Sequence, residues 1–327
     1  MPIDTTSTAG APYFDDWSAS GNSAKNYLKI LFQPGRSVQA RELNQIQSGI
    51  QSQIDKFGSH LFKEGSPIID GEINIDNKVQ YIDLTLTANG VSAASDASRP
   101  LIGKEIYADA ASATPATNPS AVDVKAVIVD YENITDNDYR IYLRYTSSTT
   151  TFDNGSRAES AIKVGTAVGT YLSQDEALSG QASAVDASYA VKISNTKGIY
   201  FVKGYFVETQ AQDKYVTFTA KKTAPVTNLN GKVGFLVVES NKTAVNDSTL
   251  YDNATGAPNY SAPGADRYTI TLDLAFITTD AGVDSTPAYV VPPTTANLID
   301  SLQVNDSKIY ATVETKYNIL GERLAQR

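Results

Sequence analysis

Hydrophobic residues at helical spacing mark one long element near the start of the chain. Between residues 36 and 64 the apolar side chains follow one another at intervals of 3, 4, 4, 3 and 4; they are Leu43, Ile46, Ile50, Ile54, Phe57 and Leu61. The mean interval of 3.6 is typical of a straight amphipathic helix. Pro34-Gly35 precedes the pattern, Ser37 suits an N-cap and Gly65 a C-terminal cap. The pattern predicts a helix over residues 37–64, about 42 Å long at about 1.5 Å per residue.

Apolar residues with a period of two indicate strands between residues 67 and 292. The alternating positions are Ile82, Leu84 and Leu86, then Ile141, Leu143 and Tyr145, and later Ile270, Leu272, Leu274 and Phe276. Such alternation is typical of a sheet with one buried and one solvated face. Continuous apolar runs at residues 127–129 and 235–238 favour strands covered on both faces. This part of the chain is therefore predicted to be an antiparallel, β-rich body.

Residues 87–121 interrupt the strand pattern. They are rich in Ala, Ser and Thr and include Pro100, Pro115 and Pro119. The region either joins two β subdomains or is a surface insertion in one. Two glycine-flanked stretches, residues 65–71 and 198–204, lie on either side of it. They indicate two similar bends of the chain in which glycine permits a positive φ.

The end of the chain returns to helical spacing. Ile309, Val313, Tyr317, Leu320 and Leu324 follow at intervals of 4, 4, 3 and 4, and Asn305 or Asp306 suits the N-cap. A C-terminal helical segment is therefore predicted within residues 293–327. Because the pattern reaches Arg327 without a capping glycine, we expect the functional chain to continue.

The predicted fold class is α+β and mainly β. A long N-terminal amphipathic helix follows an N-terminal arm within residues 1–66. One or two antiparallel β subdomains follow within residues 67–292, and a C-terminal helix within residues 293–327.

Composition removes several kinds of chemistry. The 327 residues include no cysteine and one histidine, His60, which excludes disulfides, thiolate metal sites and multi-histidine metal sites. The formal net charge of −9 disfavours a protein that binds a nucleic-acid backbone. No apolar run approaches the roughly 18 residues of a membrane span. We expect neither nucleic acid nor a membrane span among its interactions.

No catalytic or cofactor-binding motif is found. The sequence has no phosphate-binding Gly-x-x-x-x-Gly-Lys-Ser/Thr loop and no Gly-x-Ser-x-Gly elbow, and His60 is interpreted as structural or exposed. Glu72, Asn74 and Asp76 alternate near Asp70 but lack the glycine and glutamate of a calcium loop, so they are interpreted as a solvated strand face. We predict no enzyme activity, catalytic residue, metal or cofactor.

The long helical pattern leaves two interpretations open. Gln39, Gln47 and Gln53 lie on or beside the apolar stripe, and a buried amide needs hydrogen-bonding partners. Either the helix lies on a sheet of its own subunit with the glutamines at the margin, or copies of the chain pack along the stripe. The second interpretation predicts an interface of Leu43, Ile46, Gln47, Ile50, Gln53, Ile54, Phe57 and Leu61. Arg36 and Arg41 either pair with acids of a partner there or are solvated and paired locally.

Several stretches resemble a known family. They are residues 26–47, 57–65, 198–207, 250–268 and 317–327, and they include Phe-Gln-Pro-Gly-Arg at 32–36 and Asn-Tyr-Ser-Ala-Pro-Gly-Ala at 259–265. Together they resemble a family of virion structural proteins of tailed phages, associated with the baseplate and tail fibres of contractile-tailed phages and cyanophages. Residues 87–190 carry no part of this resemblance.

The resemblance implies a non-enzymatic baseplate or tail-fibre component. Such a protein is located in the virion, in the phage tail, and is assembled in the host cytoplasm. Its expected partners are copies of itself, as a trimer in preference to a dimer, and other baseplate or tail proteins, with a role in host attachment. The alternative is a module of a tail fibre that binds host-surface glycan, for which the 19 tyrosines are the motive. A glycan-degrading enzyme is the third hypothesis.

Overall fold

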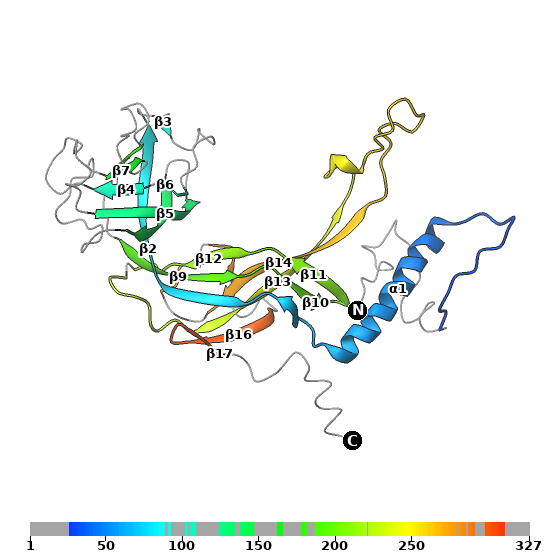
Figure 1. The fold of residues 1–327 in the computed structure, drawn as a ribbon, viewed down its shortest axis with the longest axis horizontal. Helices are drawn as coiled ribbons and strands as arrows, with labels where there is room; N and C mark the ends of the chain where they lie inside the picture. The colour runs from blue at the N-terminus through cyan, green and yellow to red at the C-terminus, as the bar shows by residue number, and fades with distance from the viewer. Residues whose placement is uncertain are drawn as a thin grey trace, which may run out of the picture.

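A computed structural model describes most of the chain outside two terminal segments and several internal ones. The described residues are 26–88, 91–92, 102–103, 105–108, 124–134, 138–146, 162–165, 178–181, 187–220, 222–278, 280, 282–285, 287–291 and 298–310. Within them the protein is mainly β, with three sheets and one α-helix, α1 (Ala40–Leu61) (Figure 1).

α1 packs against a small antiparallel sheet. Its order is β1-β10-β11, with β1 (Pro67–Asp70), β10 (Gly198–Val202) and β11 (Tyr205–Thr209). The two glycine-flanked stretches predicted to bend alike are thus paired strands, with Pro67 opposite Tyr200. Consecutive positive φ angles occur at Asp70-Gly71 (47° and 83°) and at Lys203-Gly204 (51° and 79°). The second pair is the two-residue turn of the β10–β11 hairpin, where a positive φ at both central residues matches the strand twist.

The largest sheet is organised around one long strand, β2 (Ile73–Ala88). The first half of β2 pairs with β9 (Ser188–Asn195), which pairs with β12 (Gln212–Val216). The second half pairs with β6 on one side and with β8 on the other, and the order β2-β6-β5-β4-β7-β8 returns to β2. This closed barrel lies at one end of the molecule (Figure 1). The remaining strands are β3 (Val91–Ser92), β4 (Glu105–Ala108), β5 (Val124–Asn133), β6 (Asp138–Tyr145), β7 (Ile162–Gly165) and β8 (Leu178–Gln181).

The third sheet includes a projecting ribbon. Its order is β15-β14-β13-β16-β17, with β13 (Gly231–Lys242), β14 (Arg267–Ile277), β15 (Val290–Val291), β16 (Ile299–Asn305) and β17 (Lys308–Tyr310). The β13–β14 ladder runs from Lys232 opposite Ile277 to Lys242 opposite Arg267. Its outer half extends away from the body and ends in a loop that contains the short 3₁₀ helix η4 (Ser248–Leu250) (Figure 1).

One hydrophobic core joins the three sheets. Its buried residues are Ile73, Val191, Ile193, Tyr200, Val202, Val207, Val216, Val226, Leu229, Val233, Phe235, Leu272, Leu274, Phe276 and Val304. The rings of Tyr200 and Phe235 are 4.8 Å apart in an edge-to-face arrangement. Burial of each large apolar side chain contributes about 1.5–3 kcal/mol, so these strands hold the body together.

The alternating segments predicted as strands lie in β2, β6 and β14, and the continuous apolar runs lie in β5 and β13. The runs are not covered on both faces along their whole length. Val129 and Val238 are exposed, because β5 belongs to the barrel and the outer part of β13 belongs to the projecting ribbon.

The predicted long N-terminal helix is wrong in length. α1 has 22 residues, not the 28 expected over residues 37–64. It begins after Gln39 rather than Ser37, because the Gln39 backbone is extended and its N–H donates to Glu42 Oε2 at 2.9 Å. It ends at Leu61 because Phe62 turns to an extended conformation, which places its ring near two phenylalanines of the small sheet. Gly65, with φ at 82°, lies in the turn beyond it.

The predicted C-terminal helix is also wrong where the structure describes this segment. Residues 299–305 and 308–310 form the antiparallel pair β16–β17, and Ile309 lies opposite Val304. Asp306 and Ser307 form the turn, with φ at 49° and 56°, so Asp306 caps no helix. Val304 is fully buried, which shows that the apolar positions fit a strand in the shared core. Residues 311–327, which hold the rest of the predicted helix, and the arm at 1–25 lie outside the described residues.

Candidate interaction surface

α1 is attached to the body by its small and polar side chains. Gly49, Ser52 and Gly58 are its buried residues. A Cβ atom added at Gly58 would lie 2.3 Å from the ring of Phe201 on β10. Two turns earlier, Gln51 Nε2 donates a hydrogen bond to the Gly204 carbonyl in the β10–β11 turn. The helix therefore approaches this hairpin closely because no large side chain separates them.

The residues that follow α1 make a second set of contacts with the small sheet. The Phe62 ring lies 6.0 Å from Phe201 and 6.2 Å from Phe206 between ring centroids. The Gly65 N–H donates to the Phe201 carbonyl at 2.8 Å, and the Phe201 N–H donates to the Ser66 carbonyl at 3.0 Å. These contacts join two stretches of the family resemblance, residues 57–65 and 198–207. Rings and backbone bonds together set the direction in which α1 leaves the body.

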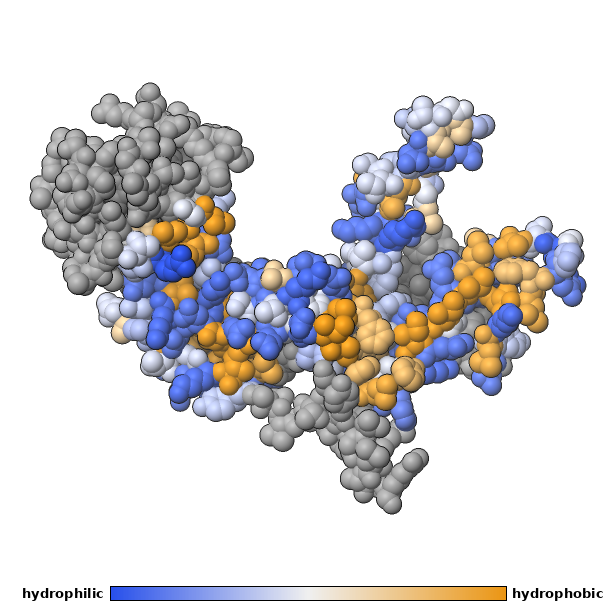
Figure 2. Space-filling view, viewed as in Figure 1, coloured by the Kyte–Doolittle hydropathy of each residue, from blue (hydrophilic) through white to orange (hydrophobic). Residues whose placement is uncertain are grey.

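Most of the apolar stripe of α1 is left exposed beside this attachment. Ser52 follows Leu43 by nine positions, which is about 180° around a helix at about 100° per residue. Leu43, Ile50 and Phe57 are 50%, 57% and 67% exposed, and Figure 2 shows apolar residues along this element. Ile54 is exposed too, whereas Ile46 and Leu61 are half-buried. The helix does lie on a sheet of its own subunit, as the first interpretation has it, but Leu43, Ile50 and Phe57 are not covered by that sheet, so the stripe stays open to a partner as the second interpretation requires.

The polar residues predicted at the interface are exposed as well. Gln47 and Gln53 lie at the margins of the stripe, as expected for residues that bond between copies or face water. Arg41 Nη2 donates to the Gln39 side chain at 3.1 Å, which is a local contact within one chain. Arg36 is exposed at the end of the Pro34-Gly35 turn, where its N–H donates to the Gln33 carbonyl at 3.3 Å. The structure thus keeps all ten predicted residues at least partly accessible.

Sequence reasoning missed the segment that precedes α1. Its large exposed side chains are Tyr27, Leu28, Leu31, Phe32 and Val38, of which Leu31 is 77% exposed. The available signal was an apolar run at 27–32 with no helical or alternating pattern of its own. With the stripe, the exposed apolar surface is on the order of 1,000 Å², since a single large aromatic side chain presents about 150–250 Å². Patches of this size mark interaction sites.

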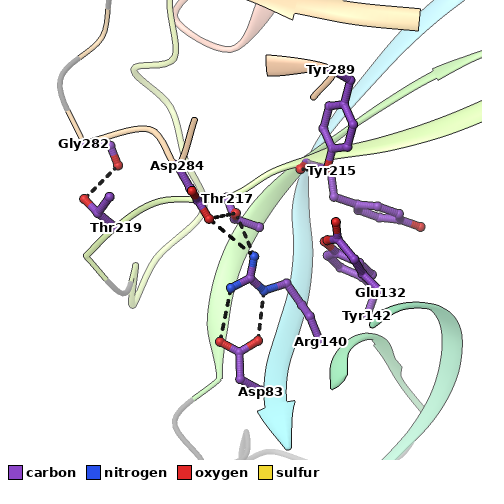
Figure 3. A network of polar contacts seen from close by, with 10 residues as sticks. All are labelled: Asp83, Glu132, Arg140, Tyr142, Tyr215, Thr217, Thr219, Gly282, Asp284 and Tyr289. Atoms are coloured by element: carbon purple, nitrogen blue, oxygen red, sulfur yellow. Dashed lines mark hydrogen bonds and ion pairs between the residues drawn. The ribbon is translucent and has the colours of Figure 1, made fainter. Parts of the chain in front are cut away.

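A second group of polar residues lies where the barrel meets the body. Arg140 on β6 makes two contacts with Asp83 on β2, Nε to Oδ1 at 2.9 Å and Nη2 to Oδ2 at 3.3 Å. Its Nη1 donates to Thr217 at 3.1 Å and lies 3.7 Å from Asp284 (Figure 3). Its guanidinium also lies over the Tyr81 ring, 4.8 Å from the ring centroid. Burial lowers the pKa of Arg140, but the hydrogen bond and charge of Asp83 more than offset it and raise the pKa above its ordinary value. Arg140 therefore stays charged, and its ion pairs and hydrogen bond link the barrel to the body.

Three tyrosines lie near Arg140 at this junction. The rings of Tyr142 and Tyr215 stack at 3.6 Å, and the Tyr142 hydroxyl donates to Glu132 at 3.3 Å. The Tyr289 hydroxyl donates to the Tyr215 carbonyl at 2.8 Å (Figure 3). Burial, with nearby carboxylates as a smaller cause, raises the pKa of all three above the ordinary value. They are neutral at physiological pH, and their packing suits a structural junction better than a surface for sugar.

The other candidate residues from the sequence are exposed to solvent. His60 is exposed on α1, and Glu72, Asn74 and Asp76 are exposed at and near the start of β2, as expected for a solvated face. Among the residues that the structure describes, no group of three or more His, Asp or Glu side chains is placed to hold a metal ion. Nor is any described helix long and apolar enough to cross a membrane.

Comparisons with known proteins found no match. No family model, no characterised protein and no solved structure matches the chain. The resemblance to tailed-phage virion proteins therefore stays a prediction.

Proposed function

We propose that this chain is a non-enzymatic structural component of a phage baseplate or tail fibre that self-associates through α1 and docks to neighbouring tail proteins. The observation that supports it best is the orientation of α1. Its small, polar side packs on the β10–β11 hairpin, while Leu43, Ile50 and Phe57 are left exposed. The cost of this exposure is removed when a partner covers the stripe.

A second copy of the chain is the occupant that we propose. The exposed apolar surface is comparable to the roughly 800 Å² that each partner contributes to a standard interface. The charged residues of α1 at neutral pH are Arg41, Glu42, Asp55 and Lys56, so the helix has no net charge and two copies do not repel. Gln47 and Gln53 lie where amides of adjacent helices bond across an interface.

The proposed place in the virion rests on the sequence resemblance and on composition. A chain with no cysteine folds in reducing host cytoplasm without disulfides and works through its surfaces. We do not propose glycan binding in its place. Tyr81, Tyr142, Tyr200 and Tyr215 are buried and offer no ring face on which a sugar can stack, and the exposed Tyr251 and Tyr260 lie in a loop for which a protein partner is proposed below.

The test is the molar mass of the full chain in solution. Light scattering after size-exclusion chromatography should give a homo-oligomer at micromolar concentration. The variant Ile50→Glu/Phe57→Glu should be monomeric with unchanged circular dichroism, because both side chains are exposed in the single chain. Lys56→Glu changes charge on the same helix away from the stripe and should leave the oligomer intact. A monomeric wild type, or a stripe variant that associates like the wild type, would overturn the proposal.

A further inference from the structure

The outer end of the β13–β14 ribbon, residues 239–242 and 267–269, takes no part in the core, although Val237 and Ile270 next to it pack against the core. β16 pairs with β13 only between residues 231 and 235, and β15 pairs with β14 only at residues 276–277. Beyond these points the two strands pair only with each other within the described part of the chain. A two-stranded ribbon is only marginally stable on its own. Since the outer end of this ribbon adds little to the stability of the body, its role is better sought in binding.

The loop at the end of this ribbon, residues 243–266, has a fixed shape. The Asp252 N–H donates to the Ala262 carbonyl at 2.9 Å, the Ser261 N–H returns to the Asp252 carbonyl at 2.9 Å, and the Gly264 N–H donates to the Leu250 carbonyl at 2.8 Å. Asp247 accepts from the Thr249 N–H at 3.0 Å and so caps η4. The loop is thus ordered mainly by its own backbone bonds, and a surface ordered in advance binds at a lower entropic cost.

The loop exposes apolar and acidic side chains. Val245 is 86% exposed, and Tyr251 and Tyr260 are exposed in the same loop. Between Lys242 and Arg267 the sequence has three aspartates and no Lys, Arg or His. Hydrogen bonds from Thr249 lower the pKa of Asp247, which keeps this carboxylate charged at neutral pH. The loop therefore matches a partner surface that is both apolar and basic.

The segment before α1 is such a surface in the same chain. Residues 26–41 have three basic residues, Lys29, Arg36 and Arg41, and no acid. They also carry the exposed apolar side chains, such as Leu31, that precede α1. Electrostatic complementarity of this kind selects the partner and fixes the register of an interface.

Both α1 and the ribbon contact the β10–β11 hairpin, and Figure 1 shows the loop and the segment before α1 projecting apart from each other, which leaves each of them available to another copy. The β10–β11 turn binds α1 through the Gly204 carbonyl and binds the ribbon through an ion pair between Lys203 and Glu239. The rings of Tyr205 and Tyr268 add a contact at 6.0 Å.

We propose that the loop at residues 243–266 of one copy docks on residues 26–41 of the next copy. The contact is head-to-tail, and repeating it around an axis closes a ring. This inference rests on the proposed self-association and adds a second contact to the one along α1.

A double-mutant cycle on the full chain tests the contact by dilution-series light scattering. Asp247→Asn/Asp252→Asn keeps the capping geometry and removes two charges. Lys29→Gln/Arg36→Gln removes two charges from the opposing segment. Each should raise the dissociation constant about tenfold, and the combined variant should be no weaker than either alone, because it removes the same contact. Asp273→Asn, exposed on β14 outside the loop, is the matched control and should have no effect.

Disulfide crosslinking is a second test of the docking, because the chain has no cysteine of its own and only the introduced cysteines can react. Ser37→Cys and Thr255→Cys, both exposed, should form a disulfide-linked dimer when mixed under oxidising conditions, whereas Ser37→Cys with Lys308→Cys should not. Additive effects in the cycle, no effect, or equal crosslinking of both mixtures would overturn the docking. In that case a wild-type oligomer still supports association through α1, and a wild-type monomer overturns both proposals.

Discussion

Gly58 of α1 lies against the ring of Phe201 so closely that no other residue fits. A Cβ atom at this position would be 2.3 Å from one ring carbon and 2.7 Å from the next. Glycine inside a helix costs about 1 kcal/mol relative to alanine. Here the cost is offset by the close approach of the helix to the β10–β11 hairpin, which in turn directs the apolar stripe outward.

Gly58→Ala should therefore destabilise the protein despite the better helix propensity of alanine. Because Phe201 is buried and lies near Phe62 and Phe206, its ring cannot move freely. Overpacking costs about 1–3 kcal/mol, so we expect a net loss of about 1 kcal/mol in the free energy of unfolding. Urea denaturation followed by circular dichroism measures it.

Lys56→Ala is the control for this change, because Lys56 is exposed on the same helix. Its effect should stay within about 0.5 kcal/mol. A stabilised Gly58→Ala protein would mean that α1 is not held against Phe201 in solution.

Arg140 ties the barrel to the body, and its removal should weaken that junction. Arg140→Met leaves Asp284 and Thr217 without their cationic partner. Since Asp83 is 45% exposed and regains water, we expect a loss of about 1–3 kcal/mol rather than the larger value of a fully buried pair. Arg140→Lys should recover only part of it, because an ammonium cannot make the two-pronged contact with Asp83.

The comparison for this site is Arg144→Met. Arg144 lies on the same strand, β6, and is exposed. Its replacement should change the free energy of unfolding by less than about 0.5 kcal/mol. Equal effects at Arg140 and Arg144 would show that the tie contributes nothing particular to stability.

Much of the β architecture could be predicted from local pattern, because a strand with one buried face carries its period in the sequence. Ile141 and Leu143 on β6, like Leu272 and Leu274 on β14, are buried as their alternation requires. The helix ends could not be predicted in this way. The end of α1 depends on Phe62 reaching Phe201, which is 139 residues further along the chain.

The C-terminal error has the same origin. Ile309 satisfies a helical interval with Val313, but its pairing with Val304 and the buried Ser307 come from tertiary structure. Ser307 Oγ accepts from the Leu229 N–H at 3.2 Å, a partner that no local pattern reveals. The interaction surface was partly predictable. The periodicity identified the stripe, but only the fold shows that the side of α1 with Gly58 and Gln51 packs on the hairpin and leaves the stripe exposed.

Gly198 tests how tightly β10 approaches the bend at Gly71. A Cβ atom at Gly198 would lie 2.6 Å from both the Cα and the N atom of Gly71 and 2.9 Å from the Ile69 carbonyl oxygen. Backbone atoms cannot rotate away, so Gly198→Ala should cost about 3 kcal/mol. Lys197→Ala, next to it and exposed in a pair with Glu208, should cost less than about 1 kcal/mol. Denaturant midpoints compare the two, and similar midpoints would contradict this close approach.

Alkaline titration should separate the buried tyrosines from the exposed ones. Burial raises the pKa of Tyr268 to about 12 and raises the pKa of Tyr142, Tyr215 and Tyr289 as well. A tyrosine in the unfolded chain ionises near pH 10, so these groups stabilise the fold fully below that pH. The stabilisation is lost as the pH rises from about 10 through the folded pKa values, because only the unfolded chain releases the protons early.

We therefore expect phenolate absorbance to rise in two phases. The second phase, from the buried tyrosines, should coincide with the loss of circular dichroism, because these groups ionise only as the chain unfolds. Tyr142→Phe should reduce the second phase. If every tyrosine ionised in the first phase while the circular dichroism stayed intact, Tyr142 and Tyr215 would not be buried at the junction of barrel and body.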